Sequence, residues 1–399
     1  MGLRRAAGQR TGSTAAPASL AARIPPAERK AAISQARPVV GRLAPSPTGV
    51  LHVGNARSLV WAWLSARAQG GRVLLRIEDL LPGESEHVAS VLADLRWLGL
   101  DWDPVEEHAA GRVMPGDYGP EFAGLPGFVL QSARAELHRA VLERLVAVGL
   151  CYPCVCTRKD IEAAVRAPHA EDKATRYPGT CRGRFPDVAA AVRWEAAQAS
   201  RRGTLAIGVA LRMKAARGEV VFEDARQGRC SGDVAAEFGD FVVRRKDGTP
   251  AYMLAVCVDD AEMGVTEVVR GDDLLEVTGQ QVLLHAALAE HATALVPRSR
   301  TPRWIHVPLV YGDDDRRLAK RNRSLHVRTL AERGVDASAL RAWIAASLGL
   351  PQDGDLDAMV DAFRARGDAG AVAVRFDQPE LEALARGEHP ELRAFVPKG

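Results

Sequence analysis

The residues best placed to bind a phosphate lie in one short stretch, Gly41 to Asn55, which reads GRLAPSPTGVLHVGN. It follows the apolar residues 38–40, which predict a strand, and precedes 56–69, a run without internal Gly or Pro that predicts a helix. A strand that breaks into a Pro- and Gly-rich loop and then opens a helix directs backbone N–H groups and the positive end of the helix dipole toward one point. This arrangement suits a phosphate, and His52 lies at that point.

The order of residues in this stretch is more specific than its composition, which alone would fit a loop that only turns the chain. Pro-Ser-Pro-Thr-Gly followed by His-x-Gly-Asn resembles the first signature of class I aminoacyl-tRNA synthetases, in the form used by the glutamyl group. Asn55 replaces the second His of the general pattern, a departure that this group shares. The resemblance implies that ATP is bound by His52, Gly54 and Asn55, and that glutamate is bound by Arg42, Ala44, Pro45 and Ser46.

Three further residues are candidates for contacts with an amino acid. Glu78 ends the strand-like run 73–77, beside the crevice where open α/β sheets bind ligands. Tyr252 lies near the start of a predicted apolar strand, and Arg270 ends a second one. Taken alone they could be a solvated acid, a core tyrosine and a structural ion-pair member. The resemblance implies that Glu78 binds the substrate ammonium group and that Tyr252 and Arg270 also contact the amino acid. A guanidinium suits a carboxylate because it can bind both oxygens.

The cysteines include a possible metal site. Cys154 and Cys156 are one residue apart, and Cys181 follows across a loop, so thiolates from two segments could close around a tetrahedral zinc. Spacing alone leaves the fourth ligand open among Cys151, His169 and Tyr177, and free core cysteines are the alternative. The resemblance implies one structural zinc held by a Cys-x-Cys and a Tyr-x3-Cys element, with Tyr177 as the fourth ligand. Cys230 and Cys257 match nothing in that pattern.

The last candidate is the basic run Arg316-Arg317-Leu318-Ala319-Lys320-Arg321. As a bare string it could be a solvated charged face. It lines up with the Lys-Met-Ser-Lys-Ser signature of class I synthetases, whose second Lys reaches the ATP phosphates. Lys320 occupies that position, whereas Arg317, Leu318 and Ala319 depart from the pattern. The resemblance therefore implies that His52 and Lys320 are catalytic and that ATP arrives with Mg²⁺.

Periodicity and breakers predict the elements that must position these residues. Strands are expected at 203–214, 219–224 and 304–310, and a hairpin turn at 244–248. Helices are expected at 86–98, 131–148, 278–290, 327–348 and 356–364. With the resemblance, this pattern implies an α/β fold: a Rossmann-like doubly wound parallel sheet, an inserted zinc-containing subdomain and a short helical C-terminal region.

The overall composition limits the class of protein and the partners that the chain can have. The chain has 399 residues, of which 47% are hydrophobic and 26% charged, so it can bury a large core in two or three domains. The net charge of +3 gives no general attraction for nucleic acid, so an RNA contact must rely on local arginine clusters. No apolar run approaches a membrane span and no signal peptide is visible, which favours a cytoplasmic protein with reduced thiols and no membrane partner.

The sequence also predicts how the chain divides into domains. Residues 1–37 are rich in Ala, Arg, Ser and Pro and predict a disordered extension or a start codon placed too early, with a transit peptide as the alternative. The remaining expected boundaries are 38–150 for the first half of the catalytic domain, 151–240 for the zinc-binding, acceptor-type insertion, 241–324 for the second half with the Lys320 loop, and 325–399 for the C-terminal region.

The resemblance is closest to short members of the glutamyl group. Only 79 residues remain after Lys320 (399 − 320), fewer than the roughly 100 of a typical domain, so no anticodon-binding domain is expected. The short members activate L-glutamate with ATP without needing tRNA and attach it to the queuosine base in the anticodon of tRNA(Asp). The resemblance thus implies ATP, glutamate and this tRNA as partners of a monomer. The alternatives are a truncated synthetase that charges tRNA(Glu) and a non-catalytic, synthetase-like RNA-binding protein.

Overall fold

The structure is a computed structural model. It describes residues 38–47, 49–81, 83–165, 176–312, 314–318, 325–352, 354–367, 371–388, 390 and 392–395. The expected extension over residues 1–37 and the expected catalytic residue Lys320 lie outside the described residues. The chain divides after Pro38, and residues 39–399 form one compact unit. The finer domain boundaries inside that unit stay predictions.

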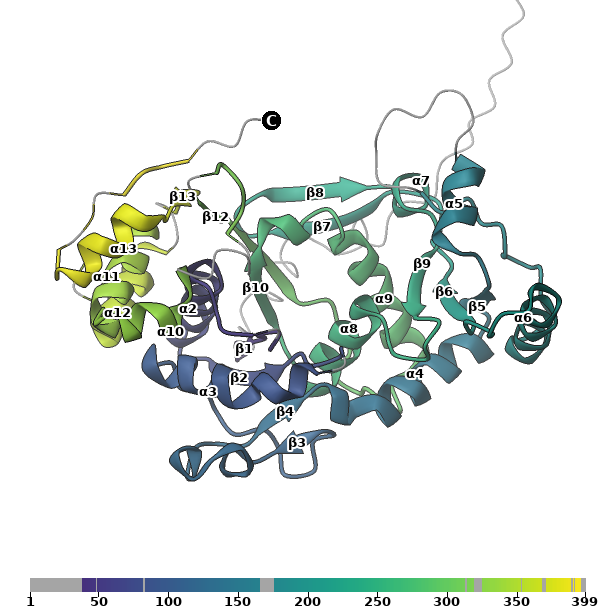
Figure 1. The fold of residues 1–399 in the computed structure, drawn as a ribbon, viewed down its shortest axis with the longest axis horizontal. Coiled ribbons are helices and arrows are strands. Elements are labelled where there is room, and N and C mark those ends of the chain that lie inside the picture. Colours follow the sequence, from purple (N-terminus) through teal and green to yellow (C-terminus); the bar gives the residue numbers. More distant parts are fainter. Residues whose placement is uncertain are drawn as a thin grey trace, which may run out of the picture. The chain divides into compact units, whose positions relative to one another are not determined.

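Parallel strands form the centre of this unit (Figure 1). On one side, β1 (Val40–Leu43) pairs with β2 (Arg72–Ile77), and β2 pairs with β4 (Phe128–Leu130). On the other side, β10 (Glu267–Gly271) pairs with β11 (Arg303–Val307), and β11 pairs with β7 (Val220–Asp224). The two halves meet where the Thr266 backbone N–H donates to the Val40 carbonyl at 2.9 Å. The strand order is therefore β4-β2-β1-β10-β11-β7, which reverses between β1 and β10 as in a Rossmann-like sheet.

Antiparallel strands complete the fold. β3 (Arg112–Val113) pairs with β4, and β8 (Gly228–Gly232) pairs with β7, so the expected parallel sheet is confirmed at its centre but is mixed at both edges. A separate antiparallel sheet has the order β5-β6-β9, formed by Cys151–Cys154, Ala210–Met213 and Phe241–Arg244. The short strands β12 (Val310–Tyr311) and β13 (Val374–Arg375) pair in parallel.

Helices flank these sheets. The helices are α2 (Val53–Ala68), α3 (Val88–Trp97), α4 (Ala135–Ala147), α5 (Arg158–Val165), α6 (Val188–Arg202), α7 (Val234–Glu237), α8 (Tyr252–Met263), α9 (Thr278–His291), α10 (Val327–Glu332), α11 (Ala337–Ser347), α12 (Leu356–Arg366) and α13 (Gln378–Ala385). Short 3₁₀ turns lie at Glu84–His87, Pro115–Tyr118, Pro120–Phe122, Ser132–Arg134 and Asp272–Leu274. Within the described ranges, no helix combines the length and apolarity that crossing a membrane requires.

The prediction of a strand at Tyr252 is wrong, because this residue begins helix α8. Residues 254–261 of the helix are all buried, so it has no exposed face and the apolar run lacks the 3.6-residue period that marks a surface helix. Gly264 ends the helix in the left-handed conformation, with φ at 70°, and β10 follows. Tyr252 therefore reaches the sheet from the first turn of a helix.

Helix α2 connects the centre of the fold to the C-terminal helices. Its Trp61 and Leu64 side chains are buried in one hydrophobic cluster that also contains Trp343 of α11 and Met359 of α12. The helix begins at the end of the first signature loop. The C-terminal region thus packs directly on the helix that carries part of the candidate site.

Candidate active site

A cavity of about 780 Å³ opens at the carboxyl ends of β1 and β10. This is the point where the strand order reverses, the usual ligand crevice of an open α/β sheet. The cavity collects every predicted ATP- and glutamate-contacting residue that the structure describes: Arg42, Ala44, Pro45, Ser46, His52, Gly54, Asn55, Glu78, Tyr252 and Arg270. Residues from four separate segments therefore face one space, while their individual roles remain predictions.

The first signature loop ends in a helix cap. His52 is the N-cap residue of α2, and its Nδ1 accepts a hydrogen bond from the Asn55 backbone N–H at 3.2 Å. A Cβ atom at Gly54 would lie 3.0 Å from two atoms of the imidazole ring, so a side chain there would crowd His52. The N-terminus of α2 thus faces the cavity with its dipole and with the His52 ring, which fits a phosphate group.

The described residues on either side of the Lys320 segment contact the cavity wall on one side and this loop on the other. Before it, Leu318 lines the cavity and its N–H donates to the Val310 carbonyl at 3.0 Å. After it, His326 forms an antiparallel bridge with His52, and the Val327 N–H donates to the Leu51 carbonyl at 2.8 Å. Arg317 and Leu318, the described residues of the second signature that line the cavity, therefore face the same space as the first signature, and the role of Lys320 stays a prediction.

Buried charges form the floor of the cavity. Arg76 donates to Asp260 at 2.6 Å and to Glu78 at 2.8 Å, and the Arg42 Nε lies 3.7 Å from the same Asp260 carboxylate. Burial raises the pKa of Glu78, although Arg76 opposes this effect. Burial alone would also raise the pKa of Asp260, but Arg76 and Arg42 lower it. The carboxylates are held by fixed guanidinium groups, so the shape of the floor does not depend on a ligand.

Arg270 differs from the other two arginines because its contacts are uncharged. Its guanidinium donates to Gln281 at 2.7 Å, to Thr278 at 2.8 Å and to the His306 Nε2 at 3.0 Å. The Trp304 ring lies beneath it, with 4.8 Å between the guanidinium carbon and the ring centroid. Burial lowers the pKa of Arg270, whose side chain is 7% exposed. A buried cation with neutral neighbours can attract an anionic ligand strongly.

Tyr252 completes the same wall of the cavity, where its side chain is 36% exposed. Burial of the phenol and the negative charge of Glu78 raise its pKa to about 12. The hydroxyl is therefore protonated at neutral pH and can donate a hydrogen bond to a carboxylate.

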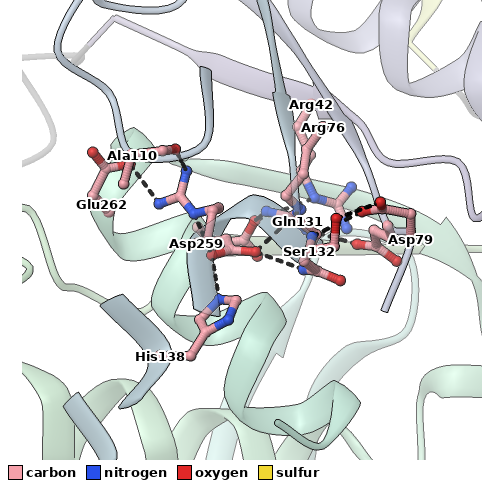
Figure 2. Close-up of polar contacts among 12 residues, drawn as sticks. Arg42, Arg76, Asp79, Ala110, Gln131, Ser132, His138, Asp259 and Glu262 are labelled. Atoms are coloured by element: carbon pink, nitrogen blue, oxygen red, sulfur yellow. Dashed lines mark hydrogen bonds and ion pairs between the residues drawn. The ribbon is translucent and has the colours of Figure 1, made fainter. Parts of the chain in front are cut away.

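A second layer of charges beneath the cavity was missed by the sequence analysis (Figure 2). The Asp259 carboxylate, on α8, lies 2.8 Å from the His138 Nε2 and 2.7 Å from the Arg134 Nε. It also accepts a hydrogen bond from the Gln131 side-chain amide. Burial would raise the pKa of Asp259, but Arg134 and His138 hold it well below its usual range. Two adjacent acids at the end of an apolar run, Asp259 and Asp260, were the available signal. They join α8 to α4 and β2 and so stiffen the cavity floor.

The predicted zinc ligands converge away from the cavity. The sulfur atoms of Cys154, Cys156 and Cys181 lie within 4.8 Å of one another, and the Tyr177 hydroxyl lies 3.4 Å from Cys154 and 3.8 Å from Cys156. Tetrahedral zinc with Zn–S bonds of about 2.3 Å needs donor separations of about 3.5–3.8 Å, so this donor set fits the ion. The hydrogen bond between the Cys154 and Cys181 sulfurs lowers the pKa of Cys181 to about 6 and raises the pKa of Cys154 to about 12, so these two groups share a proton in the absence of a metal. These four residues could hold a metal, with no position left for a substrate.

These features define a class of protein. A switch-point cavity, a His-x-Gly-Asn helix start and a second basic signature that meets it belong to the class I tRNA synthetases. A family model described as "tRNA synthetases class I (E and Q), catalytic domain" matches residues 38–360. The chain therefore belongs to this family and is an enzyme of the ligase class.

The chain is similar to curated relatives of two kinds, glutamyl-Q tRNA(Asp) synthetases and glutamate–tRNA ligases. The Glutamyl-Q tRNA(Asp) synthetase of Nitratidesulfovibrio vulgaris is 40% identical over 315 residues, which cover 78% of this chain and 87% of that protein. The protein of the same name from Nocardia farcinica is 42% identical over 314 residues, or 78% of this chain and 85% of that one. Glutamate–tRNA ligase 1 of Methylorubrum extorquens is 38% identical over 353 residues, 87% of this chain but 65% of the ligase.

A solved structure is also similar in fold. The glutamate tRNA ligase of Elizabethkingia meningosepticum, in complex with its amino acid, matches with a TM-score of 0.62 at 22% identity. The match covers 87% of this chain and 69% of that one. It supports the class I synthetase fold described above.

Proposed function

We propose that the protein activates L-glutamate with ATP, without needing tRNA, and then transfers the glutamyl group to the queuosine base in the anticodon of tRNA(Asp). The observation that carries the first half is the charge pattern of the cavity. Arg42 and Arg270 face the same space as Glu78. Two cations and one anion match the two carboxylates and one ammonium group of glutamate.

The first step is adenylate formation. A carboxylate oxygen of glutamate attacks the α-phosphorus of ATP, the bond to the β-phosphate oxygen breaks, and pyrophosphate leaves. Charge builds on the phosphoryl oxygens, so the protein acts by positioning and by positive groups rather than by a nucleophile. His52, the amides at the start of α2 and Lys320 supply these groups in the proposal, and Ala44, Pro45 and Ser46 form the wall beside glutamate. Mg²⁺ bound with ATP would neutralise part of the phosphate charge.

The second step is the transfer. A queuosine hydroxyl attacks the carbonyl carbon of the adenylate, an ester forms, and AMP leaves with the electron pair of the broken bond. In this proposal one zinc ion would act structurally, because Cys154, Cys156, Tyr177 and Cys181 would supply all four donors of a tetrahedral site. The acceptor assignment is supported by the identity of 40–42% to the two Glutamyl-Q tRNA(Asp) synthetases over 85–87% of their lengths.

The second candidate function is charging of tRNA(Glu). The similarity to Glutamate–tRNA ligase 1 of Methylorubrum extorquens favours it, at 38% identity. Both candidates use the same adenylate, so the structure of the cavity does not separate them.

The acceptor is tested by incubating the protein with labelled glutamate, ATP and total tRNA from cells that make queuosine. We expect the label on tRNA(Asp), and none on tRNA(Asp) from cells that lack queuosine. Label on tRNA(Glu) would establish the second candidate. Absence of glutamate-dependent ATP–pyrophosphate exchange would overturn both and favour a non-catalytic, RNA-binding role.

A further inference from the structure

The contacts of Arg270 extend to a buried pair of residues on two neighbouring strands. His306, on β11, has a side chain that is 0% exposed, and its Nε2 lies 3.0 Å from the Arg270 Nε. Its Nδ1 lies 2.7 Å from the Asp224 Oδ2, which also accepts the His306 backbone N–H at 3.0 Å. Asp224, Nδ1, Nε2 and Arg270 thus form one continuous chain of hydrogen bonds.

The chemistry of the donors fixes the proton in this chain. An arginine Nε–H can only donate, so the Nε2 of His306 must present its lone pair. The proton of the neutral ring must then lie on Nδ1, from which it donates to the Asp224 carboxylate. Burial lowers the pKa of His306, which also favours the neutral ring. The Asp224 carboxylate therefore selects the one tautomer that can accept a hydrogen bond from Arg270.

Asp224 is itself held rigidly at the end of β7. Its Oδ1 accepts the backbone N–H groups of Arg226 and Gln227, both at 2.9 Å, in the turn between β7 and β8. Nothing in this pair lines the cavity, so neither residue contacts the substrate directly. The His306 Nε2 also lies 3.1 Å from the Thr278 hydroxyl, which itself accepts a hydrogen bond from Arg270, so the pair reaches the cavity through Arg270 and this partner of Arg270.

We propose that Asp224 and His306 are positioning residues that orient the Arg270 guanidinium toward a substrate carboxylate. This inference rests on the proposed activation of glutamate. It assigns to β7, which belongs to the segment expected to form a separate insertion, a direct part in amino-acid recognition.

The test is steady-state ATP–pyrophosphate exchange with three variants. Asp224→Asn keeps the shape of the side chain but offers an N–H to the ring, which favours the tautomer that repels Arg270. His306→Leu removes the acceptor, and His306→Gln keeps a carbonyl oxygen able to accept from Arg270. We expect the KM for glutamate to rise about tenfold or more in the first two variants, less in His306→Gln, and the KM for ATP to stay unchanged.

His285→Leu is the matched control, because it also removes a buried imidazole that packs on Trp304, with 6.2 Å between the ring centroids. Among the described residues, neither ring nitrogen of His285 has a hydrogen-bond partner. We expect its KM for glutamate to match that of the wild-type protein. A similar rise in His285→Leu, or equal changes in the KM for ATP and for glutamate, would overturn the positioning role.

Two further measurements keep the inference testable if a variant folds poorly. In an Arg270→Lys background, Asp224→Asn should add little to the loss, because the residue it positions is gone; fully additive effects would contradict the proposal. Nitrogen NMR of histidine-labelled wild-type protein should find Nδ1 protonated and Nε2 bare in His306, and the opposite tautomer would also contradict it. If the wild-type protein shows no exchange, the proposed function fails, whereas normal exchange with unshifted variants defeats only this inference.

Discussion

The three arginines around the cavity are compensated to different degrees. Arg76 lies within 4 Å of three carboxylates, and Arg42 shares one of them at 3.7 Å. The hydrogen-bond partners of Arg270 among the described residues are all neutral. Positive charge is therefore left over where the side-chain carboxylate or the α-carboxylate of an amino acid would bind. This uneven compensation is what should make the cavity select a dicarboxylic substrate.

We expect glutamine to be a poor substrate for the same reason. Glutamine lacks the second carboxylate, so one buried guanidinium would stay without an anion. The ratio of kcat/KM for glutamate over glutamine should be at least about 10² in ATP–pyrophosphate exchange. Equal values of kcat/KM for glutamate and glutamine would show that Arg42 and Arg270 do not both bind carboxylates.

Lys320→Ala should leave the protein folded and slow adenylate formation. Loss of one group that stabilises charge in the transition state costs about 3 kcal/mol, or roughly a hundredfold in rate. Exchange measured at saturating ATP and glutamate reports this loss. Arg316→Ala is the control, because Arg316 is an exposed cation in the same basic run. Unchanged exchange in Lys320→Ala would remove the assignment of the second signature.

Asp94 links the two signature loops through a buried carboxylate. Its Oδ2 accepts the Leu51 N–H at 3.1 Å, and its Oδ1 lies 4.0 Å from Arg328, just beyond the Lys320 segment. Burial raises the pKa of Asp94 from 3.8 to about 6, although the Leu51 N–H and Arg328 oppose the shift. The folded protein therefore binds a proton here more tightly than the unfolded chain does.

This shift predicts the direction of a pH effect on stability. Between pH 3.8 and about 6 the folded state holds more protons at Asp94, so its contribution falls as the pH rises, by about 3 kcal/mol in all. Below this window the effect vanishes, and above it the penalty is complete. Asp94→Asn keeps an acceptor for Leu51 without this penalty. Urea unfolding at pH 4, 5, 6 and 7 should find that the variant gains stability over wild type as the pH rises; a difference independent of pH would contradict the assignment.

At the scale of elements, the cluster of Cys154, Cys156, Tyr177 and Cys181, which could hold a metal, joins strand β5 to the loop before α6. We predict about one zinc per chain, because four donors from two segments fit a closed tetrahedral site. Cys181→Ser should lower the zinc content and the melting temperature, since structural zinc contributes folding free energy. Cys230→Ser is the control, because its sulfur lies outside the cluster and its hydrogen bond among the described residues is to the Gly228 carbonyl, at 3.6 Å. Elemental analysis that finds no zinc would refute the site.

Elements with a clear period or clear breakers could be predicted from the sequence. The strand that ends before Glu78 and the helix that begins at Thr278 lie where alternation and breakers indicated. Helix α8 could not be predicted in this way, because a helix that is buried on all sides gives the same apolar run as a buried strand. The start of α2 was expected three residues late, since the cap made by His52 depends on side-chain geometry.

The residues of the candidate site also fall into two groups, those that belong to a local sequence pattern and those that come together only in the fold. Residues such as Arg42, Glu78 and Arg270 could be predicted because they belong to short strings with a recognisable order. Asp224 and His306 could not, because they are 82 residues apart and come together only when β7 and β11 pair. Contacts that depend on strand order leave no local pattern in the sequence.

At the scale of the whole molecule, Arg57 connects the first signature helix to the C-terminal region. Its side chain is 1% exposed and donates to the Ser347 hydroxyl at 2.7 Å and carbonyl at 3.0 Å, to the Val372 carbonyl at 2.8 Å and to the Pro308 carbonyl. Pro308 precedes Leu309, which lines the cavity. One buried guanidinium thus holds α2, α11 and the wall of the cavity together.

Arg57→Met should therefore destabilise the protein. Three carbonyl groups, of which that of Ser347 is buried, would lose their donor, at a cost of about 3 kcal/mol. Arg364→Met is the matched control, because the Arg364 side chain is 55% exposed and its polar partners among the described residues are the Ala68 carbonyl and Asp361. We expect the control to change the free energy of unfolding by less than about 1 kcal/mol. Urea denaturation measures both, and equal losses would contradict a central role for Arg57.

The pairing of β7 with β11 also limits how this enzyme can be recombined with others. A chimera that exchanged residues 151–240 as one cassette would replace Asp224 together with the candidate metal cluster. The partner of His306 would then come from the donor sequence, although the cavity residues Arg42, Glu78 and Arg270 were retained. A crossover point between Met213 and Val220 would instead transfer strands β5 and β6 with the candidate metal ligands, while β7 kept its native pairing with β11.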